Sequence, residues 1–170
     1  MGFRRTMRGA GEEPEIRELK LTESIFQELA ELSRNIYFFE GIPVENLNEL
    51  CQDIGLFEFP AETSIVRQGS PGDSFFLMYS GRAKVRVKRG FLRGTLEVAT
   101  LVRGHVFGEM ALVLDQPRSA DVIADGPVQS FVIRRRVFEA ILKDNKLFAK
   151  KVHELVKRRT QENDFVKAYI

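Results

Sequence analysis

The stretch that decides the fold reads His105-Val106-Phe107-Gly108-Glu109-Met110-Ala111-Leu112-Val113-Leu114-Asp115-Gln116-Pro117-Arg118-Ser119-Ala120-Asp121-Val122-Ile123-Ala124-Asp125. Gly108 lets the backbone approach a ligand closely, and the residues after it have the composition of a short helix. The first amide groups of such a helix lack partners within it and attract an anion. Arg118 adds a planar fork of donors that suits two phosphate oxygens, and Ser119 adds a hydroxyl. The stretch therefore predicts a site for an anionic phosphate.

Glu109 adds a carboxylate to this pattern. Because like charges repel, Glu109 is not expected to contact the phosphate, but a carboxylate accepts well from a sugar hydroxyl. A phosphate beside a free ribose hydroxyl describes a nucleotide. The alternative is that Glu109 and Arg118 pair with each other in a turn and hold no ligand.

The run Phe107-Gly108-Glu109-Met110-Ala111-Leu112, followed after five residues by Arg118-Ser119-Ala120, resembles the phosphate-binding cassette of the cyclic nucleotide-binding domain family. The spacing is similar to that in regulatory subunits of cyclic AMP-dependent kinase and in bacterial cyclic nucleotide-gated channels. The resemblance is specific because Gly, Glu, Arg and a small residue agree in type and in spacing together. It covers about residues 38–160 of the chain.

The resemblance implies a role for each cassette residue. Glu109 would bind the ribose 2′-hydroxyl, Arg118 an exocyclic phosphate oxygen, and backbone amides the rest of the phosphate. Arg158 or Arg159 lies about where channel members place an arginine over the purine. The residues expected at the ligand are Val106, Phe107, Gly108, Glu109, Met110, Ala111, Arg118, Ser119, Ala120, Arg158 and Arg159.

Ser119 bears on the choice of nucleotide. In the resembling family, cyclic GMP-selective members often have threonine at this position, kinase cyclic AMP sites have alanine, and serine accompanies cyclic AMP in bacterial members. A hydroxyl here can also reach the guanine amino group. The resemblance therefore implies cyclic AMP as the ligand, with a modest preference over cyclic GMP, and no cofactor.

Short strands dominate the middle of the chain. Lys84–Lys88 and Leu96–Leu101 alternate as half-buried strands do, and Ser74–Tyr79 is an apolar run of strand length. The turns that separate the strands are expected at Gln68–Asp73, Ser80–Gly81, Arg89–Gly90, Arg93–Gly94, Arg103–Gly104 and Asp125–Pro127. Many short strands between close turns predict an antiparallel β-roll or jelly roll over about residues 54–133. The expected fold class is α+β, mainly β, with a short cassette helix.

Helices are expected before the roll. From Ser24 to about Ile36 apolar residues recur at helical spacing, and Ser24 with Gln27 can form a capping box. A second short helix is expected from Pro43 to about Cys51, with the proline near its start.

Helices are also expected after the roll, over about residues 134–163. Val137–Leu142 resembles the hinge helix of the family, and Lys146 to about Asn163 would be its lid helix. From Arg134 to Thr160 there are ten basic residues against three acidic ones. By default, such a basic segment is interpreted as the solvent-exposed face of a helix. Its positive charge also raises the electrostatic potential around an anion bound beneath the helix. We expect the segment from Lys146 onward to move on binding, and truncation after Asn145 to weaken binding without unfolding the roll.

The length of 170 residues suits one domain. Residues 1–22 are expected to be a flexible basic arm and residues 23–170 the cyclic nucleotide-binding domain. Met1–Thr6 fits the loose pattern for N-myristoylation, which we read as a chance match.

Several function classes are not expected. No stretch approaches the roughly 18 apolar residues of a membrane span. Cys51 is the single cysteine, so no disulfide framework can form within the chain. Because the chain also shows no secretory leader, it is expected to be cytoplasmic or the cytoplasmic part of something larger. His105 and His153 are remote in sequence and no metal-ligand spacing occurs, so we expect neither an enzyme nor a metal site.

Two other functions stay open. A transcription regulator of the catabolite-activator type carries a DNA-binding helix-turn-helix after the lid helix, and the chain stops at Ile170, so this alternative is a sensor without its DNA-binding domain. The other is an interaction platform that binds no ligand, which is disfavoured because Glu109, Arg118 and Ser119 are all present. A homodimer and an effector domain or protein are the further partners considered, and nucleic acid is not expected.

Overall fold

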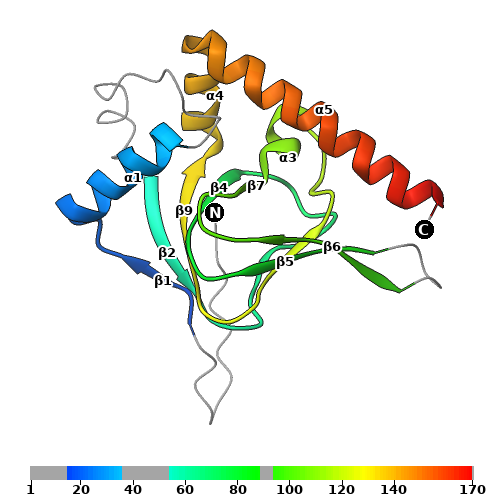
Figure 1. The fold of residues 1–170 in the computed structure, drawn as a ribbon, viewed down its shortest axis with the longest axis horizontal. Coiled ribbons are helices and arrows are strands. Elements are labelled where there is room, and N and C mark those ends of the chain that lie inside the picture. Colours follow the sequence, from blue (N-terminus) through cyan, green and yellow to red (C-terminus); the bar gives the residue numbers. More distant parts are fainter. Residues whose placement is uncertain (1–14, 36–53, 89–93, 170) are drawn as a thin grey trace.

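The computed structural model describes residues 15–35, 54–88 and 94–169 of the chain. Within these ranges it forms a β-roll with helices along one side (Figure 1). The elements are β1 (Arg17–Leu19), α1 (Glu23–Asn35), β2 (Ile54–Phe59), β3 (Ser64–Val66), β4 (Ser74–Ser80), β5 (Ala83–Lys88), β6 (Thr95–Leu101), β7 (Val106–Phe107), α3 (Glu109–Val113), β8 (Asp121–Ala124), β9 (Val128–Arg134), α4 (Arg135–Asp144) and α5 (Lys146–Tyr169).

The strands form two sheets with the orders β1-β2-β9-β4-β7 and β3-β8-β5-β6. All of their pairings are antiparallel. The short helix α3 follows β7 directly, and α4 and α5 follow β9 (Figure 1). This arrangement confirms the expected fold class, a mainly antiparallel roll with helices before, within and after it.

Strand β4 is buried on both faces, which explains why its sequence is an unbroken apolar run. Phe75 and Leu77 belong to a cluster that the helices cover. Phe76 and Met78 point the other way, into a second cluster between the two sheets. A strand covered on both sides has no solvated face, so polar residues do not alternate along it.

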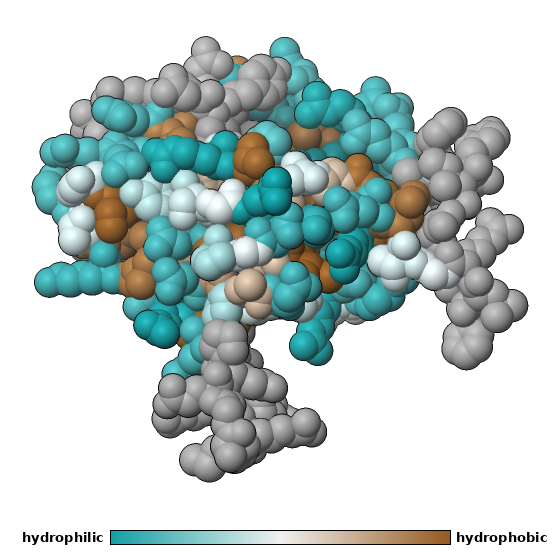
Figure 2. Space-filling model, turned by 60° about the horizontal axis from the view of Figure 1, so that its bottom comes forward, coloured by the Kyte–Doolittle hydropathy of each residue, from teal (hydrophilic) through white to brown (hydrophobic). Residues whose placement is uncertain are grey.

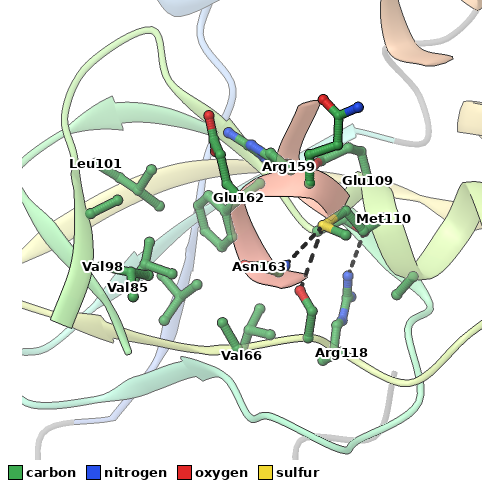
Figure 3. Close-up of a pocket in the computed structure, with 18 residues that line it drawn as sticks. Val66, Val85, Val98, Leu101, Glu109, Met110, Arg118, Arg159, Glu162 and Asn163 are labelled. Atoms are coloured by element: carbon green, nitrogen blue, oxygen red, sulfur yellow. Dashed lines mark hydrogen bonds and ion pairs between the residues drawn. The ribbon is translucent and has the colours of Figure 1, made fainter. Parts of the chain in front are cut away.

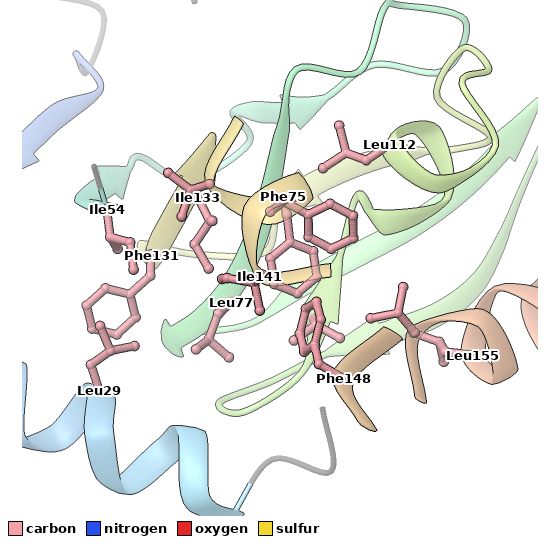
Figure 4. Packing of buried hydrophobic residues seen from close by; sticks show 14 of the residues in the cluster. Leu29, Ile54, Phe75, Leu77, Leu112, Phe131, Ile133, Ile141, Phe148 and Leu155 are labelled. Atoms are coloured by element: carbon pink, nitrogen blue, oxygen red, sulfur yellow. The ribbon is translucent and has the colours of Figure 1, made fainter. Parts of the chain in front are cut away.

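The helix-side cluster joins the sheet to the C-terminal helices (Figure 4). The ring of Phe138 on α4 lies 5.3 Å from that of Phe75 and 5.8 Å from that of Phe148 on α5, measured between centroids. Phe148 and Val152 are completely buried. Aromatic pairs of this kind contribute about 0.5–1.5 kcal/mol beyond the area they bury. The first turns of α5 are therefore part of the core, which combines residues of the strands and of the C-terminal helices.

The N-terminal segment differs from expectation in two ways. Arg17–Leu19 are not a flexible arm but pair with β2, with Leu19 opposite Leu56. Leu19 also packs against the helix-side cluster, which gives the strand an apolar anchor. Helix α1 begins one residue before Ser24, and the Ile25 amide donates to Thr22 Oγ1 at 3.3 Å. The cap is therefore Thr22, and the capping box expected at Ser24 was wrong.

Some expectations fall outside the described residues. These are the helix from Pro43 to about Cys51, the end of the first helix at Ile36, and the myristoylation pattern at Met1–Thr6.

The surface seen in Figure 2 is mostly hydrophilic, with apolar side chains scattered over it. Among the described residues, the exposed large apolar side chains are Val98 in β6, Val102 directly after it, Leu114 after α3 and Leu147 in α5. No helix in the described part of the chain is long and apolar enough to cross a membrane. The same part contains no group of three or more His, Cys, Asp and Glu residues that could hold a metal ion.

Candidate ligand site

A cavity of about 570 Å³ lies where the cassette, the four-stranded sheet and α5 meet (Figure 3). Its size is in the range of small-molecule sites, about 300–1,000 Å³. The residues that line it are Val66, Val85, Val98, Ala99, Leu101, Phe107, Gly108, Glu109, Met110, Ala111, Arg118, Ser119, Ala120, Val122, Arg159, Gln161, Glu162 and Asn163. The cavity is thus an apolar chamber with a few charged groups gathered at one end.

Gly108 forms the turn that begins α3 at the edge of this cavity. Its φ is +89°, a conformation that residues with a side chain rarely adopt. A Cβ at this position would lie 2.6 Å from Arg118 Nη1 and 3.0 Å from the Ser74 carbonyl oxygen. Glycine is therefore required twice, once by the backbone conformation and once by the closeness of Arg118.

Arg118 is buried beside this turn, with only 5% of its surface exposed. Its Nη1 donates to the Gly108 carbonyl and its Nη2 to the Ser74 carbonyl, each at 2.7 Å. The guanidinium carbon lies 5.7 Å from the centroid of the Phe76 ring, and Nη2 lies 4.0 Å from Asp73 Oδ1. These contacts fix the plane of the guanidinium at the wall of the cavity.

Burial lowers the pKa of Arg118 below its ordinary value, while the nearby charges of Asp73 and Glu109 act in the opposite direction. An arginine starts so far above neutral pH that it stays charged. Arg118 therefore places a buried positive charge at the wall of the cavity, where it suits an anionic group of a ligand.

Glu109 is the other charged group of the cassette, and its side chain is only 2% exposed. Its Oε1 accepts a hydrogen bond from Arg159 Nη1 on α5 at 2.6 Å. The same guanidinium donates through Nη2 to the Val106 carbonyl at 2.9 Å. Among the described residues, Glu109 and Arg118 form no ion pair with each other. The alternative in which those two side chains satisfy one another is therefore contradicted.

Met110 joins the cassette to α5 in a second place. Ser119 Oγ donates to Met110 Sδ at 3.6 Å, and Asn163 Nδ2 donates to the same sulfur at 3.7 Å (Figure 3). Both are weak bonds because a thioether is a poor acceptor.

The structure gathers most of the residues expected at the site. Phe107 to Ala111, Arg118 to Ala120 and Arg159 all line the cavity. Val106 does not, because its side chain is in the core and only its carbonyl meets Arg159. Arg158 is exposed and lies outside the lining, since adjacent helix residues point about 100° apart.

Other lining residues were not predicted. The apolar wall comes from β3, β5, β6 and β8, and β5 has an irregular register between Val85 and Arg86, which breaks the simple alternation. Glu162 and Asn163 stand three and four residues after Arg159, so helical spacing alone places them on the same face. The turn expected at Gln68–Asp73 leads into β4. It also supports Arg118 through Asp73 and Ser74.

The fold and the cavity define a ligand-binding β-roll closed by a C-terminal helix. Residues 56–145 match the sequence profile of the family described as cyclic nucleotide-binding domain. The chain belongs to this family of cyclic nucleotide-binding domains.

Known relatives agree with this assignment. A cGMP-dependent protein kinase from Eimeria tenella is 31% identical over 123 residues, which are 72% of this chain and 12% of that kinase. The chain thus spans a small part of this curated relative. A cyclic nucleotide-binding domain from Methylobacillus flagellatus superposes with a TM-score of 0.71 at 24% identity, covering 90% of this chain and 87% of that one. The regulatory domain of Toxoplasma gondii PKA with cAMP gives 0.68 at 24% identity, covering 80% and 50%. The two structural likenesses show the shared fold.

Proposed function

We propose that the cavity binds one cyclic nucleotide monophosphate per chain, with cyclic AMP preferred modestly over cyclic GMP. The observation that carries this proposal is the buried, oriented guanidinium of Arg118 at the charged end of a cavity whose remaining wall is mostly apolar. A cyclic phosphate has a single negative charge and needs such a partner when it leaves water. The apolar remainder of the cavity suits a purine.

Each polar group has a distinct role in this proposal. Arg118 pairs with an exocyclic phosphate oxygen, and the backbone of the cassette contacts the others. Glu109 accepts the ribose 2′-hydroxyl. Ser119 lies beside Met110 and is the one hydroxyl side chain among the described residues that line the cavity. One neutral hydrogen bond contributes about 0.5–1.5 kcal/mol net, which limits the preference for either base.

The domain acts as a sensor in this proposal, because α5 supplies both part of the cavity and part of the core. A ligand shifts the position of α5 only through its differential affinity for two arrangements. A coupling of about 1–3 kcal/mol is typical of regulatory domains. The change in the position of α5 is transmitted to an effector domain or protein. Transmission through a homodimer is the second route.

Calorimetry with cyclic AMP and cyclic GMP tests the proposal, and the kinase relative makes the cyclic GMP arm necessary. Arg118→Ala is expected to weaken binding by about 2–5 kcal/mol, because it removes the partner of an enclosed charge. Arg158→Ala is the matched control, since that arginine is exposed and lies outside the cavity. If Arg118→Ala binds within about twofold of the parent, the site is wrong. A clear preference for cyclic GMP would overturn the choice of base and leave the site intact.

A further inference from the structure

Arg159 makes a contact that differs from the role expected for it over the purine. Its guanidinium bridges the Glu109 carboxylate and the Val106 carbonyl, at 2.6 and 2.9 Å. One side chain of α5 is thus bonded at once to the first residue of α3 and to the strand before it. The fork of an arginine fixes both partners in one plane, which a lysine cannot do.

Glu109 depends on this contact. Its carboxylate is almost fully buried, and a buried charge is costly unless it is paired and hydrogen-bonded. Among the described residues, Arg159 is the one side chain that donates to it. Glu109 lines the cavity, and among the described residues no side chain donates to its Oε2, which leaves that oxygen for a ligand hydroxyl.

We propose that Arg159 is a positioning residue that acts through Glu109. It holds the carboxylate turned so that Oε2 accepts the ribose 2′-hydroxyl. This inference rests on the proposed function of the cavity. Its consequence is that recognition of the sugar belongs to α5 as much as to the cassette. The domain discriminates ribose from 2′-deoxyribose only while α5 is docked.

The test compares cyclic AMP with 2′-deoxy cyclic AMP, because the two differ by the hydroxyl in question. The parent protein should bind the ribose form about 10-fold to 100-fold more tightly, the range for a hydrogen bond to a charged group. In Arg159→Ala this ratio should fall below about threefold, as it should in Glu109→Gln. Arg159→Lys should give an intermediate ratio, since it restores the charge without the fork.

Arg158→Ala is the control, because it removes the same charge from the neighbouring position of the same helix and should leave the ratio unchanged. Thermal unfolding of each variant checks that it is folded, and Arg159→Lys carries the test if the alanine variant is not. In a double variant, Glu109→Gln with Arg159→Ala, the affinity ratio of the two nucleotides should fall no further than in either single variant. Both changes act on the same hydrogen bond to the ribose 2′-hydroxyl.

An equal loss of affinity for both nucleotides in Arg159→Ala, with the ratio intact, would overturn the inference, because Arg159 would then only anchor α5. A parent protein that binds both forms equally would also overturn it, while leaving the cavity as the binding site. Absence of binding to either nucleotide would remove the proposed function itself. These three results are therefore distinguishable.

Discussion

The two halves of α5 are held in place by different forces. Its first half, from Phe148 to Val156, contributes buried apolar side chains to the core beneath it. Its second half, from Arg159 to Asn163, is held by an ion pair, a backbone carbonyl and a thioether. Apolar burial does not depend on a ligand, whereas Arg159 and Asn163 in the second half bind Glu109 and Met110, which line the cavity. The boundary between core and lid therefore lies inside a continuous helix, near residue 158.

The largest expected effect is a loss of stability when an apolar side chain in the first half of α5 is removed. Phe148→Ala should lower the free energy of unfolding by about 3–5 kcal/mol, because it leaves a cavity beside Phe138 in the core. Urea denaturation measures this. Leu147→Ala is the matched control, since that neighbouring side chain is 44% exposed, and it should change stability by less than about 0.5 kcal/mol. Similar losses in both variants would mean that α5 does not share the core.

Truncation separates the halves directly. A chain that ends after Arg158 should keep the fold but bind cyclic AMP less tightly by about 1.5–3 kcal/mol, because Glu109 loses its partner. A chain that ends after Asn145 should instead be destabilised, since it loses Phe148 and Val152, contrary to the expectation from sequence. Calorimetry and thermal unfolding report the two effects. Ending the chain after Asp164 is the control, because Arg159 and Asn163 remain.

Hydrogen exchange locates the boundary without mutation. Amides of Phe148–Val156 should be strongly protected with or without cyclic AMP, because opening them exposes the core. Amides of Arg159–Asn163 should gain protection of about 1–3 kcal/mol when the nucleotide is added, the size of a typical coupling. Equal protection of the second half in both states would describe a static binding module.

The smallest expected effect is a change in stability from a substitution in the roll, at Asp125. This substitution lies away from α5 and serves as a control. A hydrogen bond from Lys84, helped by the charge of Arg82, holds the pKa of Asp125 below its usual range. The folded state therefore gains stability above the ordinary aspartate pKa of about 3.9, and loses it as the pH falls through the lower folded value. Asp125→Asn should lower the melting temperature slightly at pH 7, and the difference should vanish in acid. Binding of cyclic AMP should not change.

The parts that sequence predicts well are those encoded locally. The spacing of Gly108, Glu109 and Arg118 identifies the cassette because all three lie within one short segment. The apolar run of β4 marks a strand, and the starts of β2, α4 and α5 lie within a residue or two of their predicted positions. Such features depend on neighbouring residues and on the period of the chain.

The parts that sequence does not predict depend on distant pairings. Arg159 meets Glu109 across 50 residues, and Arg118 meets Ser74 across 44. The contact of Arg118 depends on strand register, and the contact of Arg159 depends on the angle at which α5 crosses the roll. The strand at Arg17–Leu19 has a polar composition and is stabilised by the edge of β2 that it covers. No local pattern encodes these three contacts.

The length of α5 has a mechanical consequence. At about 1.5 Å per residue, Asn163 lies roughly 22 Å along the axis from Phe148, so the helix is a lever with its pivot in the core. A tilt of about 5° at that pivot would displace the far end by roughly 2 Å, which is small for apolar packing near the pivot but enough to break a hydrogen bond. A rotation that barely disturbs the core is therefore amplified at Arg159. The stiffness of one unbroken helix sets how sharply the domain can switch.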